Sequence, residues 1–543
     1  MSPAELIAMP PEQPDQPLWL ILSGAYVGQE LAIELGQLPP SMIPVGHSRL
    51  YEMQLDAIGP GQRVYLALPA QYQPPIEDLR RLRDRGVQIV QMPEGLTLGE
   101  AVVYAFNYIG VSDHPVRILH GDTFVRDIPE AIDTIAVASS SDDYQWADVE
   151  VKDGLVTKLH TASAGANGGD RLVATGYFAC SSCSLLLRSI VLSHGDFIAG
   201  LQEYNRQRPL QASSVEQWLD FGHIQTFFQS RRSASTARAF NDVRIGQHVV
   251  RKSSASNAQK IRAETRWLAD APPALLPFCS RVIDSGEGPD GPFYETEYEY
   301  MLTLSELYLF GSIGRTGWTR VVNACADFLQ TCASLESGAM DNTTLRLLTN
   351  NMFGRLERFA RETGFDIEAP TALDGSPLPS LLAIAEQVQA RIDLETPRPQ
   401  RAMHGDFCFS NIFYNARARR VRVIDPRGFA EEGVFSHYGD SRYDMAKLAH
   451  SAIGQYDLII GGRYHCERQS PTGFKLEFEN TPGRLWLKDA FGEITVQGQR
   501  LACDEIQAIM TGLFLSMLPL HSDRPDRQQA FIANALRLFK ERS

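Results

Sequence analysis

Residues 404–411 and the aspartate fourteen positions beyond them constrain this 543-residue chain more than any other feature. The segment reads His-Gly-Asp-Phe-Cys-Phe-Ser-Asn, and Asp425 follows the short apolar run 421–424. In phosphoryl transfer from a magnesium nucleotide, one carboxylate orients and deprotonates the acceptor hydroxyl, while an amide oxygen and a second carboxylate hold the metal ions. Asp406, Asn411 and Asp425 fit these roles in this order. Taken singly, each of them would be interpreted as a turn or cap residue.

Upstream residues supply the other parts that such a site needs. Lys252 follows the strand-like run 247–251, and Glu264 lies in the helical pattern 261–268. A lysine on a strand meets the phosphates, and a glutamate on the next helix holds that lysine. Two more strands, 281–284 and 293–298, flank a glycine-rich turn, so the order predicts a small antiparallel lobe, a hinge and a helical lobe. The alternative is that Lys252 and Glu264 are solvated surface charges.

From about residue 240 to the C-terminus, these motifs resemble the aminoglycoside phosphotransferase and choline kinase family, which phosphorylates small alcohols with a protein-kinase-like fold. The resemblance implies an α+β domain of two lobes, the small one about 240–302 and the helical one about 303–543. Only Gly246 stands where a protein kinase would have a glycine-rich loop, which argues against a protein kinase. The implied site consists of Asp406 as catalytic base, Asn411 and Asp425 as Mg²⁺ ligands, and Lys252, Glu264, Glu297 and Tyr298 as the residues that bind or position ATP.

Other polar residues of the helical lobe are candidates for substrate contacts. Asp440, Asp444 and Lys447 share one side of a predicted helix at spacings of four and three, which favours a salt-bridged helix face. In the alternative, Asp440 or Asp444 supports the 404–411 loop or meets the acceptor. Arg427 either touches phosphate or braces the loop. His521 follows a dense apolar stripe within the helical region 504–539 and is a further candidate.

The first part of the chain contains a second set of motifs. The apolar strand 18–22 opens into a turn with Ser23, Gly24 and Gly28, and strand 116–119 leads to Asp122. Near residue 220 stands Trp-Leu-Asp-Phe-Gly. In order and spacing these segments resemble sugar-phosphate nucleotidyltransferases. The resemblance implies a Rossmann-like α/β domain with a mixed sheet, nucleotide binding by the turn, and Asp122 and Asp220 as metal ligands. Strand-end capping is the alternative for the two aspartates.

The N-terminal motifs depart from that family at two cations. Glu30 stands where the glycine turn is expected to carry an arginine, and Ser41 stands where a lysine is expected. Losing two cations beside a triphosphate removes roughly a few kcal/mol of binding unless Arg49, Lys152 or Lys158 replaces them. The domain is therefore either an active transferase or a fold kept for binding or regulation.

Length and composition fit two domains, because 543 residues exceed one core, and 44% hydrophobic with 21% charged residues is ordinary globular composition. We expect a flexible tail at 1–17, domains at 18–235 and 236–543, and a small-residue polar link at 231–237. The net charge of −14 disfavours nucleic acid as a partner. No stretch predicts a signal peptide or membrane insertion, which favours the cytoplasm. Eight cysteines in so long a chain predict neither a disulfide framework nor a zinc site.

These features predict a bifunctional enzyme with small molecules and nucleotides as partners. Its kinase would use Mg²⁺ and ATP on a sugar or alcohol, and its nucleotidyltransferase would use a second nucleoside triphosphate of undefined base. The kinase's product type is the transferase's substrate type, so the fusion would make an activated precursor for capsule or surface polysaccharide biosynthesis. In the alternative, the kinase works with a noncatalytic nucleotide or sugar-phosphate sensor.

Overall fold

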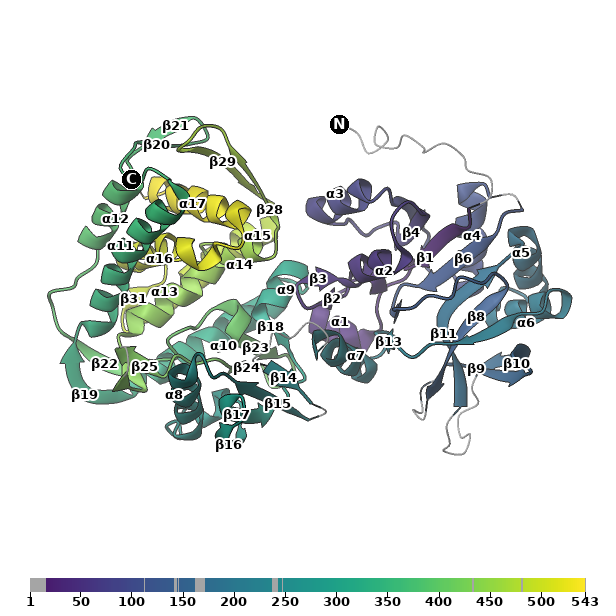
Figure 1. Ribbon diagram of the computed structural model, residues 1–543, viewed down its shortest axis with the longest axis horizontal. Helices are drawn as coiled ribbons and strands as arrows, with labels where there is room; N and C mark the ends of the chain where they lie inside the picture. The colour runs from purple at the N-terminus through teal and green to yellow at the C-terminus, as the bar shows by residue number, and fades with distance from the viewer. Residues whose placement is uncertain are drawn as a thin grey trace. The chain divides into compact units, whose positions relative to one another are not determined.

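The structure is a computed structural model that describes residues 16–542 except 112, 141–143, 145, 162–170, 237–242, 247, 432–433 and 480–481. It divides into two units, one of Met1–Ala234 with Phe310–Ser312 and one of Ser235–Leu309 with Ile313–Ser543 (Figure 1). Most of the predicted tail, residues 1–15, lies outside the described residues. The predicted polar link is helical as far as it is described, because α7 (Ile224–Thr236) continues through it.

The first unit is built on one mixed β-sheet. Its described strands follow the order β5-β4-β1-β6-β11-β8-β12-β10-β9. Strands β5, β4, β1 and β6 run parallel, whereas β11 is antiparallel to both β6 and β8. The predicted α/β class with a mixed sheet is therefore confirmed. The bounds are Gln88–Met92 for β5, Arg63–Pro69 for β4, Leu18–Leu22 for β1, Val116–His120 for β6, Arg171–Cys180 for β11, Thr134–Ser140 for β8, Gln211–Ser214 for β12, Leu155–Thr161 for β10 and Ala147–Lys152 for β9.

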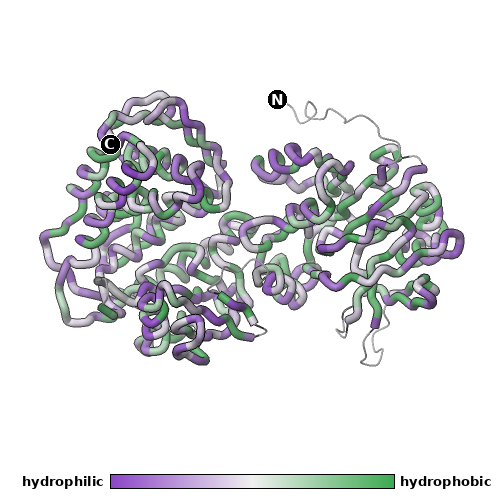
Figure 2. Tube along the Cα trace, viewed as in Figure 1, coloured by the Kyte–Doolittle hydropathy of each residue, from purple (hydrophilic) through white to green (hydrophobic). Residues whose placement is uncertain are grey.

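Helices cover both faces of this sheet because successive strand residues point to opposite sides. Leu18, Leu20 and Leu22 of β1 pack in one core with α4 (Leu98–Ile109), α5 (Cys183–Leu192) and α6 (Phe197–Gln207). Trp19 and Ile21 pack in the other core with α2 (Leu50–Ile58) and α3 (Ile76–Asp84). Figure 2 shows hydrophobic central strands in this sheet and a largely hydrophilic α3.

The second unit begins with the predicted antiparallel lobe. Its four described strands follow the order β14-β15-β17-β16, with bounds Val243–Ile245, Val249–Ser253, Gly291–Glu297 and Val282–Gly288. Helix α8 (Ala258–Ala269) packs beside β17, and its Trp267 is fully buried and donates Nε1–H to the Met403 carbonyl at 3.0 Å. That bond ties the small lobe to the strand end that leads into the 404–411 loop.

The rest of the second unit is helical with short strands between the helices. Helix α16 (Asp504–Ser516) is buried along most of its length and packs against α11, α12, α13 and α17, so it is the centre of this lobe. The predicted two-lobed α+β class is confirmed. The other helices are α9 (Leu304–Phe310), α10 (Arg315–Ser334), α11 (Thr343–Thr363), α12 (Leu381–Ala390), α13 (Ser441–Ala452), α14 (Tyr456–Ile460), α15 (Pro482–Gly492) and α17 (Pro525–Lys540).

Short strands of this lobe position its loops. The hairpin of β23 (Ile412–Asn415) and β24 (Arg420–Val423) pairs with β18 (Leu302–Thr303), and β22 (Arg398–Ala402) lies between β19 (Glu336–Asp341) and β27 (Tyr438–Gly439). Across the described helices of both units, none has the length and hydrophobicity needed to cross a bilayer.

Candidate active site

The β23–β24 hairpin brings the two parts of the principal motif together. Ile412 pairs with Val423 in antiparallel register, and one step beyond, Ile424 N–H donates to the Asn411 carbonyl at 3.1 Å. Arg427 N–H donates to the His404 carbonyl at 2.8 Å. The loop that enters β23 and the segment that leaves β24 therefore lie side by side. Asp425 has a φ of +58°, a left-handed conformation that aspartate tolerates better than most residues.

The Asp406 carboxylate is held at both oxygens. Lys447 Nζ, on α13, lies 2.8 Å from Oδ1, and Asn411 Nδ2 donates to Oδ2 at 3.0 Å. Burial opposes the charge on Asp406, but Lys447 outweighs it and keeps the pKa below the usual value for a carboxyl. Asp406 is therefore ionised at neutral pH and can accept a hydrogen bond from a substrate hydroxyl. Among the described residues, the Asn411 amide oxygen receives only a 3.5 Å contact from Ser410 Oγ, and it keeps capacity for a cation.

His404 and Asp444 support the backbone of this loop. His404 Nδ1 accepts from Asp406 N–H at 3.2 Å, so Nε2 carries the proton and donates to the Ile424 carbonyl at 2.9 Å. Burial lowers the pKa of His404 to about 4, which keeps the ring neutral. The Asp444 carboxylate accepts the backbone N–H groups of His404 at 2.6 Å and Gly405 at 2.8 Å, while burial raises its pKa to about 7. Loop support is thus the interpretation that the geometry favours for Asp444.

Lys252 joins the small lobe to the hairpin. Its Nζ lies 2.8 Å from Glu264 Oε2 and 3.0 Å from Asp425 Oδ1, and Tyr294 OH donates to Glu264 Oε2 at 3.0 Å. Burial disfavours the charge of Lys252, but Asp425 and Glu264 outweigh it, so its pKa is raised. A cation held between two carboxylates in this way can receive a phosphate oxygen without losing its own support.

Glu297 and Tyr298 lie where the small lobe ends. Glu297 is the last residue of β17 and pairs with Val249, and Tyr298 N–H donates to the His248 carbonyl at 2.9 Å. The Glu297 side chain is exposed, and the Tyr298 ring packs against Tyr300 with 4.8 Å between centroids. Both residues are therefore at the predicted hinge, a few positions before β18.

A cavity of about 390 Å³ opens beside the 404–411 loop. Asp406, Asn411, Asp425 and Arg427 all line it. Arg427 also braces the loop, because its backbone N–H bonds to the His404 carbonyl. The structure therefore supports the bracing role, and the Arg427 side chain lines the cavity.

His521 does not belong to the lining of this cavity. It ends the short 3₁₀ helix Leu518–His521 and packs on Phe531, with 4.9 Å between ring centroids.

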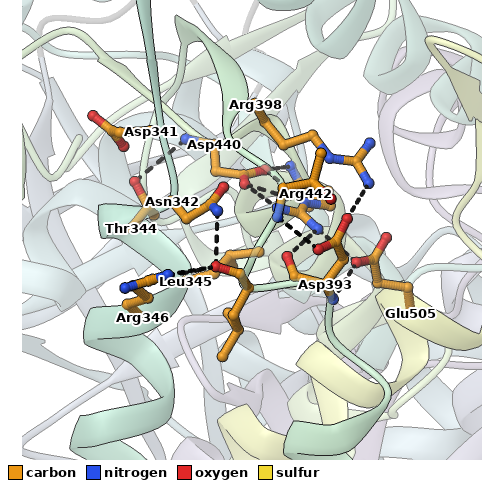
Figure 3. Close-up of polar contacts among 12 residues, drawn as sticks. Asp341, Asn342, Thr344, Leu345, Arg346, Asp393, Arg398, Asp440, Arg442 and Glu505 are labelled. Carbon is orange, nitrogen blue, oxygen red and sulfur yellow. Dashed lines mark hydrogen bonds and ion pairs between the residues drawn. The ribbon is translucent and has the colours of Figure 1, made fainter.

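Asp440 belongs to a buried network that Figure 3 shows in close-up. It caps the N-terminus of α13 and accepts from Arg442 Nη2 at 2.6 Å, and Arg442 Nη1 lies 2.5 Å from Glu505 of α16. The prediction of a salt-bridged helix face is therefore wrong. Asp440, Asp444 and Lys447 point to three different partners because packed loops and helices cover that side of α13.

One contact and one side chain of this site escaped the sequence analysis. The partner of Lys447 could not be inferred, because Asp406 is far away along the chain and the i, i+3 rule offered Asp444 instead. Arg355, in the middle of α11, also lines the cavity, and its sequence neighbours carry no motif that distinguishes it from the surface arginines of the same helix.

In the first unit, the predicted nucleotide turn lies at the carboxyl ends of β1 and β6. Leu22 pairs with His120, and Gly121 N–H donates to the Leu22 carbonyl at 2.9 Å. A Cβ on Gly121 would lie 2.6 Å from the Ser23 Cβ, so only glycine permits this approach. Strand order runs from β1 outward to β4 and β5 in one direction and to β6 in the other. In open α/β sheets, ligands bind at the strand ends where the order reverses in this way.

Asp122 and Asp220 meet beside this turn. Strands β7 (Thr123–Val125) and β13 (Trp218–Asp220) are antiparallel, with Asp220 opposite Thr123. A Cβ on Gly222 would lie 2.7 Å from Asp122 Oδ2 and 3.5 Å from Asp220 Oδ1, so both carboxylates face the same small space. Burial, together with the neighbouring Asp122, raises the pKa of Asp220 to about 7. Two like charges at such a point can be compensated by a cation.

The three cations that could replace the two missing ones have other partners or lie on distant strands. Arg49 is buried, with Nε 2.8 Å from Asp78 Oδ2. Lys158 Nζ lies 3.2 Å from Glu150, and Lys152 and Lys158 are on β9 and β10, which lie far from β1 in the sheet order. Glu30 is exposed in the first turn of α1 (Gln29–Leu35), and Ser41 is buried and donates its N–H to Ser23 Oγ at 2.9 Å. The predicted compensation is therefore not found at these three residues.

Each unit offers two oxygen-donor side chains, and this small number suits magnesium. Nowhere in the described residues do three or more His, Cys, Asp or Glu side chains gather as a metal site. Mg²⁺ usually takes one or two protein carboxylates and completes its shell with water and substrate phosphates. Asn411 with Asp425, and Asp122 with Asp220, match that smaller requirement.

Comparison with known proteins finds a matching family model over part of the chain. Residues 226–464 match the model of the phosphotransferase enzyme family. This match confirms the predicted resemblance for that part of the chain, and with it the prediction of a phosphotransferase-type enzyme domain. No curated protein matches the chain.

Similar solved structures are of two kinds. The nucleoside-diphosphate-sugar pyrophosphorylase from Vibrio cholerae RC9 is 12% identical with a TM-score of 0.32, over 40% of this chain and 100% of that chain. CTP:phosphocholine cytidylyltransferase from Streptococcus pneumoniae is 9% identical with a TM-score of 0.31, over 40% and 98%. The GDP complex of wild-type aminoglycoside 2'-phosphotransferase-IIIa is 13% identical with a TM-score of 0.30, over 56% and 89%.

Proposed function

We propose that the second unit transfers the γ-phosphoryl group of ATP to the hydroxyl of a small sugar or alcohol. The observation that carries this proposal is the convergence of Lys252, Glu264 and Asp425 with the Asp406–Asn411 loop in one unit. Each of these residues has a partner that fixes its side chain, which is what electrostatic catalysis of phosphoryl transfer requires.

In this mechanism, Asp406 accepts the hydrogen bond of the acceptor hydroxyl and orients its oxygen. Lys447 and Asn411 keep the carboxylate ionised and fixed. The acceptor oxygen forms a bond to the γ-phosphorus as the bond to the β–γ bridging oxygen breaks, ADP leaves, and the hydroxyl proton passes to Asp406. Lys252 neutralises phosphate charge, and Asn411 and Asp425 would hold Mg²⁺. Magnesium there would offset the charge that develops on the phosphates.

The test is Asp406→Asn, which keeps the size and one hydrogen-bond acceptor but removes the base. We expect kcat to fall roughly 10²- to 10⁴-fold with ATP binding nearly unchanged. The acceptor is found by mass spectrometry of metabolite extracts incubated with ATP and either wild type or the variant. Asp366→Asn, on the loop after α11, is the matched control and should keep full turnover. Near-normal turnover of Asp406→Asn would contradict the assignment.

For the first unit we propose nucleotidyl transfer to a phosphorylated sugar or alcohol. An oxygen of the acceptor phosphate would form a bond to the α-phosphorus of a nucleoside triphosphate, and the bond to the α–β bridging oxygen would break to release pyrophosphate. The Ser23–Gly28 turn would receive the phosphates. Asp122 and Asp220 would hold Mg²⁺, and their shared space beside Gly222 supports this role. The charge of that cation would align and neutralise the two phosphate groups.

A noncatalytic sensor is the second candidate for this unit, because one specific observation favours it. Glu30 and Ser41 replace two expected cations, and Arg49, Lys152 and Lys158 have other partners or positions. Pyrophosphate release from ATP, CTP, GTP and UTP, each with the kinase product, separates the candidates. Release that Asp122→Asn abolishes supports catalysis. Absence of release with every pair, while the kinase is active, supports the sensor.

The two proposed reactions together suggest a biosynthetic role. The phosphate that the second unit adds is the group that the first unit would couple to a nucleotide, so the chain would produce an activated precursor. We propose that this precursor serves surface polysaccharide biosynthesis in the cytoplasm. Deletion of the gene in its host should then reduce surface polysaccharide, and restoration by the Asp406→Asn variant would argue against this role.

A further inference from the structure

Helix α8 is docked against the catalytic segment at two points. Trp267 of α8 donates Nε1–H to the carbonyl of Met403, the residue directly before the 404–411 loop, at 3.0 Å. Farther along the chain, a Cβ added to Gly428 would lie 2.5 Å from the Ala263 carbonyl oxygen, so the segment that follows β24 touches the α8 backbone. The position of α8 relative to the proposed catalytic residues is therefore fixed at two of its turns.

Lys260 belongs to the face of α8 that is directed to the site. Lys260, Glu264 and Trp267 recur at spacings of four and three, which places them along one side of the helix. Lys260 lines the cavity of about 390 Å³ that the proposed base and both proposed Mg²⁺ ligands also line. Among the described lining residues, it is the one that comes from the small lobe. Its side chain therefore borders the space where the proposed reaction takes place.

Helix stability does not account for a lysine at this position. Lys260 is the third residue of α8, and the helix dipole disfavours a cation in the first turn. Its i, i+4 pair with Glu264 has the weaker orientation, because glutamate N-terminal to lysine is the better order. The Lys260 side chain is 57% exposed, and its Nζ lies 3.6 Å from Glu264 Oε1. The ammonium group can therefore reach a ligand without breaking a strong contact.

One buried carboxylate, that of Glu264, lies between two lysines. Its Oε2 lies 2.8 Å from Lys252 Nζ and accepts a hydrogen bond from Tyr294 OH at 3.0 Å. Its Oε1 has no hydrogen-bond partner in the described chain and faces Lys260 at the longer distance. Lys252 also contacts Asp425, at 3.0 Å. Lys252 is therefore held by two carboxylates, whereas Lys260 can turn toward a phosphate in the cavity.

The proposed reaction places the γ-phosphoryl group in this cavity. In-line transfer puts it between the acceptor oxygen at Asp406 and the metal ions at Asn411 and Asp425. Charge spreads over its three equatorial oxygens during transfer, and a positioned cation stabilises that charge. A protein kinase covers the phosphates with a glycine-rich loop, and in this sequence only Gly246 stands at that place. A side chain of the small lobe can supply the contact that such a loop would make.

We propose that Lys260 binds an oxygen of the γ-phosphoryl group, as a second phosphate-binding lysine beside Lys252. This inference rests on the proposed kinase function and adds a residue to its catalytic machinery. Lys260 forms and breaks no covalent bond in the transfer. Its ammonium group donates hydrogen bonds to the γ-phosphoryl oxygens, whereas Lys252 meets the phosphates that remain in ADP.

The experiment compares nucleotides with and without a γ-phosphate. ADP and AMP-PNP, the ATP analogue with an imido group between the β- and γ-phosphorus, are titrated with Mg²⁺ into the full chain, and calorimetry measures Kd. The first unit is also proposed to bind nucleotides, so the binding event that Asp425→Asn removes is assigned to the second unit. Absence of any such event would refute nucleotide binding by that unit, and the inference with it.

Replacing Lys260 should affect the two nucleotides unequally. We expect Lys260→Met to raise Kd for AMP-PNP at least about ten-fold and Kd for ADP less than about two-fold. Lys260→Arg keeps a cation and should recover part of the lost affinity. An equal loss for AMP-PNP and ADP would show that Lys260 acts through Glu264 and Lys252, and it would overturn the inference. Unchanged Kd values for both nucleotides, as a solvated surface lysine would give, would also overturn it.

Arg262→Met is the matched control. Arg262 lies on the same helix, is 59% exposed and pairs with Glu287 at 2.8 Å, but it is not among the described residues that line the cavity. Its replacement should change neither Kd. Urea unfolding of Lys260→Met should match that of wild type, because the lysine contributes little to the helix.

Kinase turnover separates failure of this inference from failure of the proposed function. With the acceptor found for wild type, Lys260→Met should lower kcat/KM for ATP at least about ten-fold and leave KM for the acceptor unchanged. ATP turnover that is the same in wild type and Asp406→Asn would refute the kinase function, whatever calorimetry shows. Turnover that depends on Asp406, together with wild-type affinity of Lys260→Met for AMP-PNP, would refute the role of Lys260 alone.

Discussion

Lys447 Nζ lies 2.8 Å from Asp406 Oδ1, although 41 residues separate them and they lie on different elements of the second unit. Asp406 stands in a loop that Asp444 holds by its backbone, and Lys447 is one turn further along α13 than Asp444. One helix therefore positions both the backbone and the carboxylate of the proposed catalytic base.

Replacing Lys447 with Met should change the pH dependence of the kinase. Lys447 is the main opposing influence that keeps the pKa of Asp406 low despite burial, so its loss raises that pKa. Asp406 must be ionised to act, and activity is lost as pH falls through its pKa. We expect the acidic limb of the kcat/KM profile to move to higher pH, with a loss of roughly 10- to 100-fold at pH 6 and a smaller one at pH 8.

The profile is measured between pH 5 and 9 with the acceptor found for the wild type. Lys475→Met, which removes an exposed cation paired with Glu477, is the control and should leave the profile unchanged. An acidic limb at the wild-type position in Lys447→Met would show that Lys447 does not govern the ionisation of Asp406.

Glu264→Gln should weaken nucleotide binding more than catalysis. Glu264 is fully buried and fixes Lys252 at 2.8 Å, and glutamine keeps the shape but removes the charge that holds the ammonium group. We expect KM for ATP to rise by about ten-fold with a smaller effect on KM for the acceptor. Glu287→Gln, which breaks an exposed pair with Arg262, is the matched control. Equal increases in both KM values would point to a general disturbance of the fold.

Local motifs predicted the parts of the site whose positions follow from strand geometry. The order of the 404–411 loop, the strand after it and Asp425 implies a hairpin, and a hairpin places its two ends together. Lys252 and Glu264 were predicted from the same kind of order, and the structure brings them within 3 Å of each other. Spacing along α13 was less informative, because it identifies a helix face but not what covers that face. Composition at residues 231–236 indicated a polar link but not its helical conformation, since small polar residues also suit the end of a helix.

Asp440→Asn should reduce stability and leave substrate affinity unchanged. Arg442 is 2% exposed and depends on Asp440 and Glu505, so loss of the Asp440 charge leaves a buried cation partly uncompensated. Breaking one side of a buried ion pair costs about 3–5 kcal/mol, and the amide retains part of the hydrogen bonding. Urea unfolding should therefore show a clear loss of stability for the second unit. A normal unfolding curve with a raised KM for the acceptor would instead support a substrate contact for Asp440.

Divalent cations should stabilise the first unit through Asp122 and Asp220. The two carboxylates face one space beside Gly222, and their repulsion in a buried setting disfavours the ionised pair. A bound cation removes that repulsion, so Mg²⁺ at about 100 times its Kd should stabilise the native unit by about 2.7 kcal/mol. Asp220→Asn removes one ligand and the repulsion together.

The Asp220→Asn variant should therefore be at least as stable as wild type without Mg²⁺, and it should gain little stability when Mg²⁺ is added. Asp153→Asn, on an exposed turn, should keep the wild-type response. Calorimetric scans at pH 8 with Mg²⁺ or EDTA measure these shifts independently of activity, and an equal Mg²⁺ response in wild type and Asp220→Asn would remove the metal role of this pair.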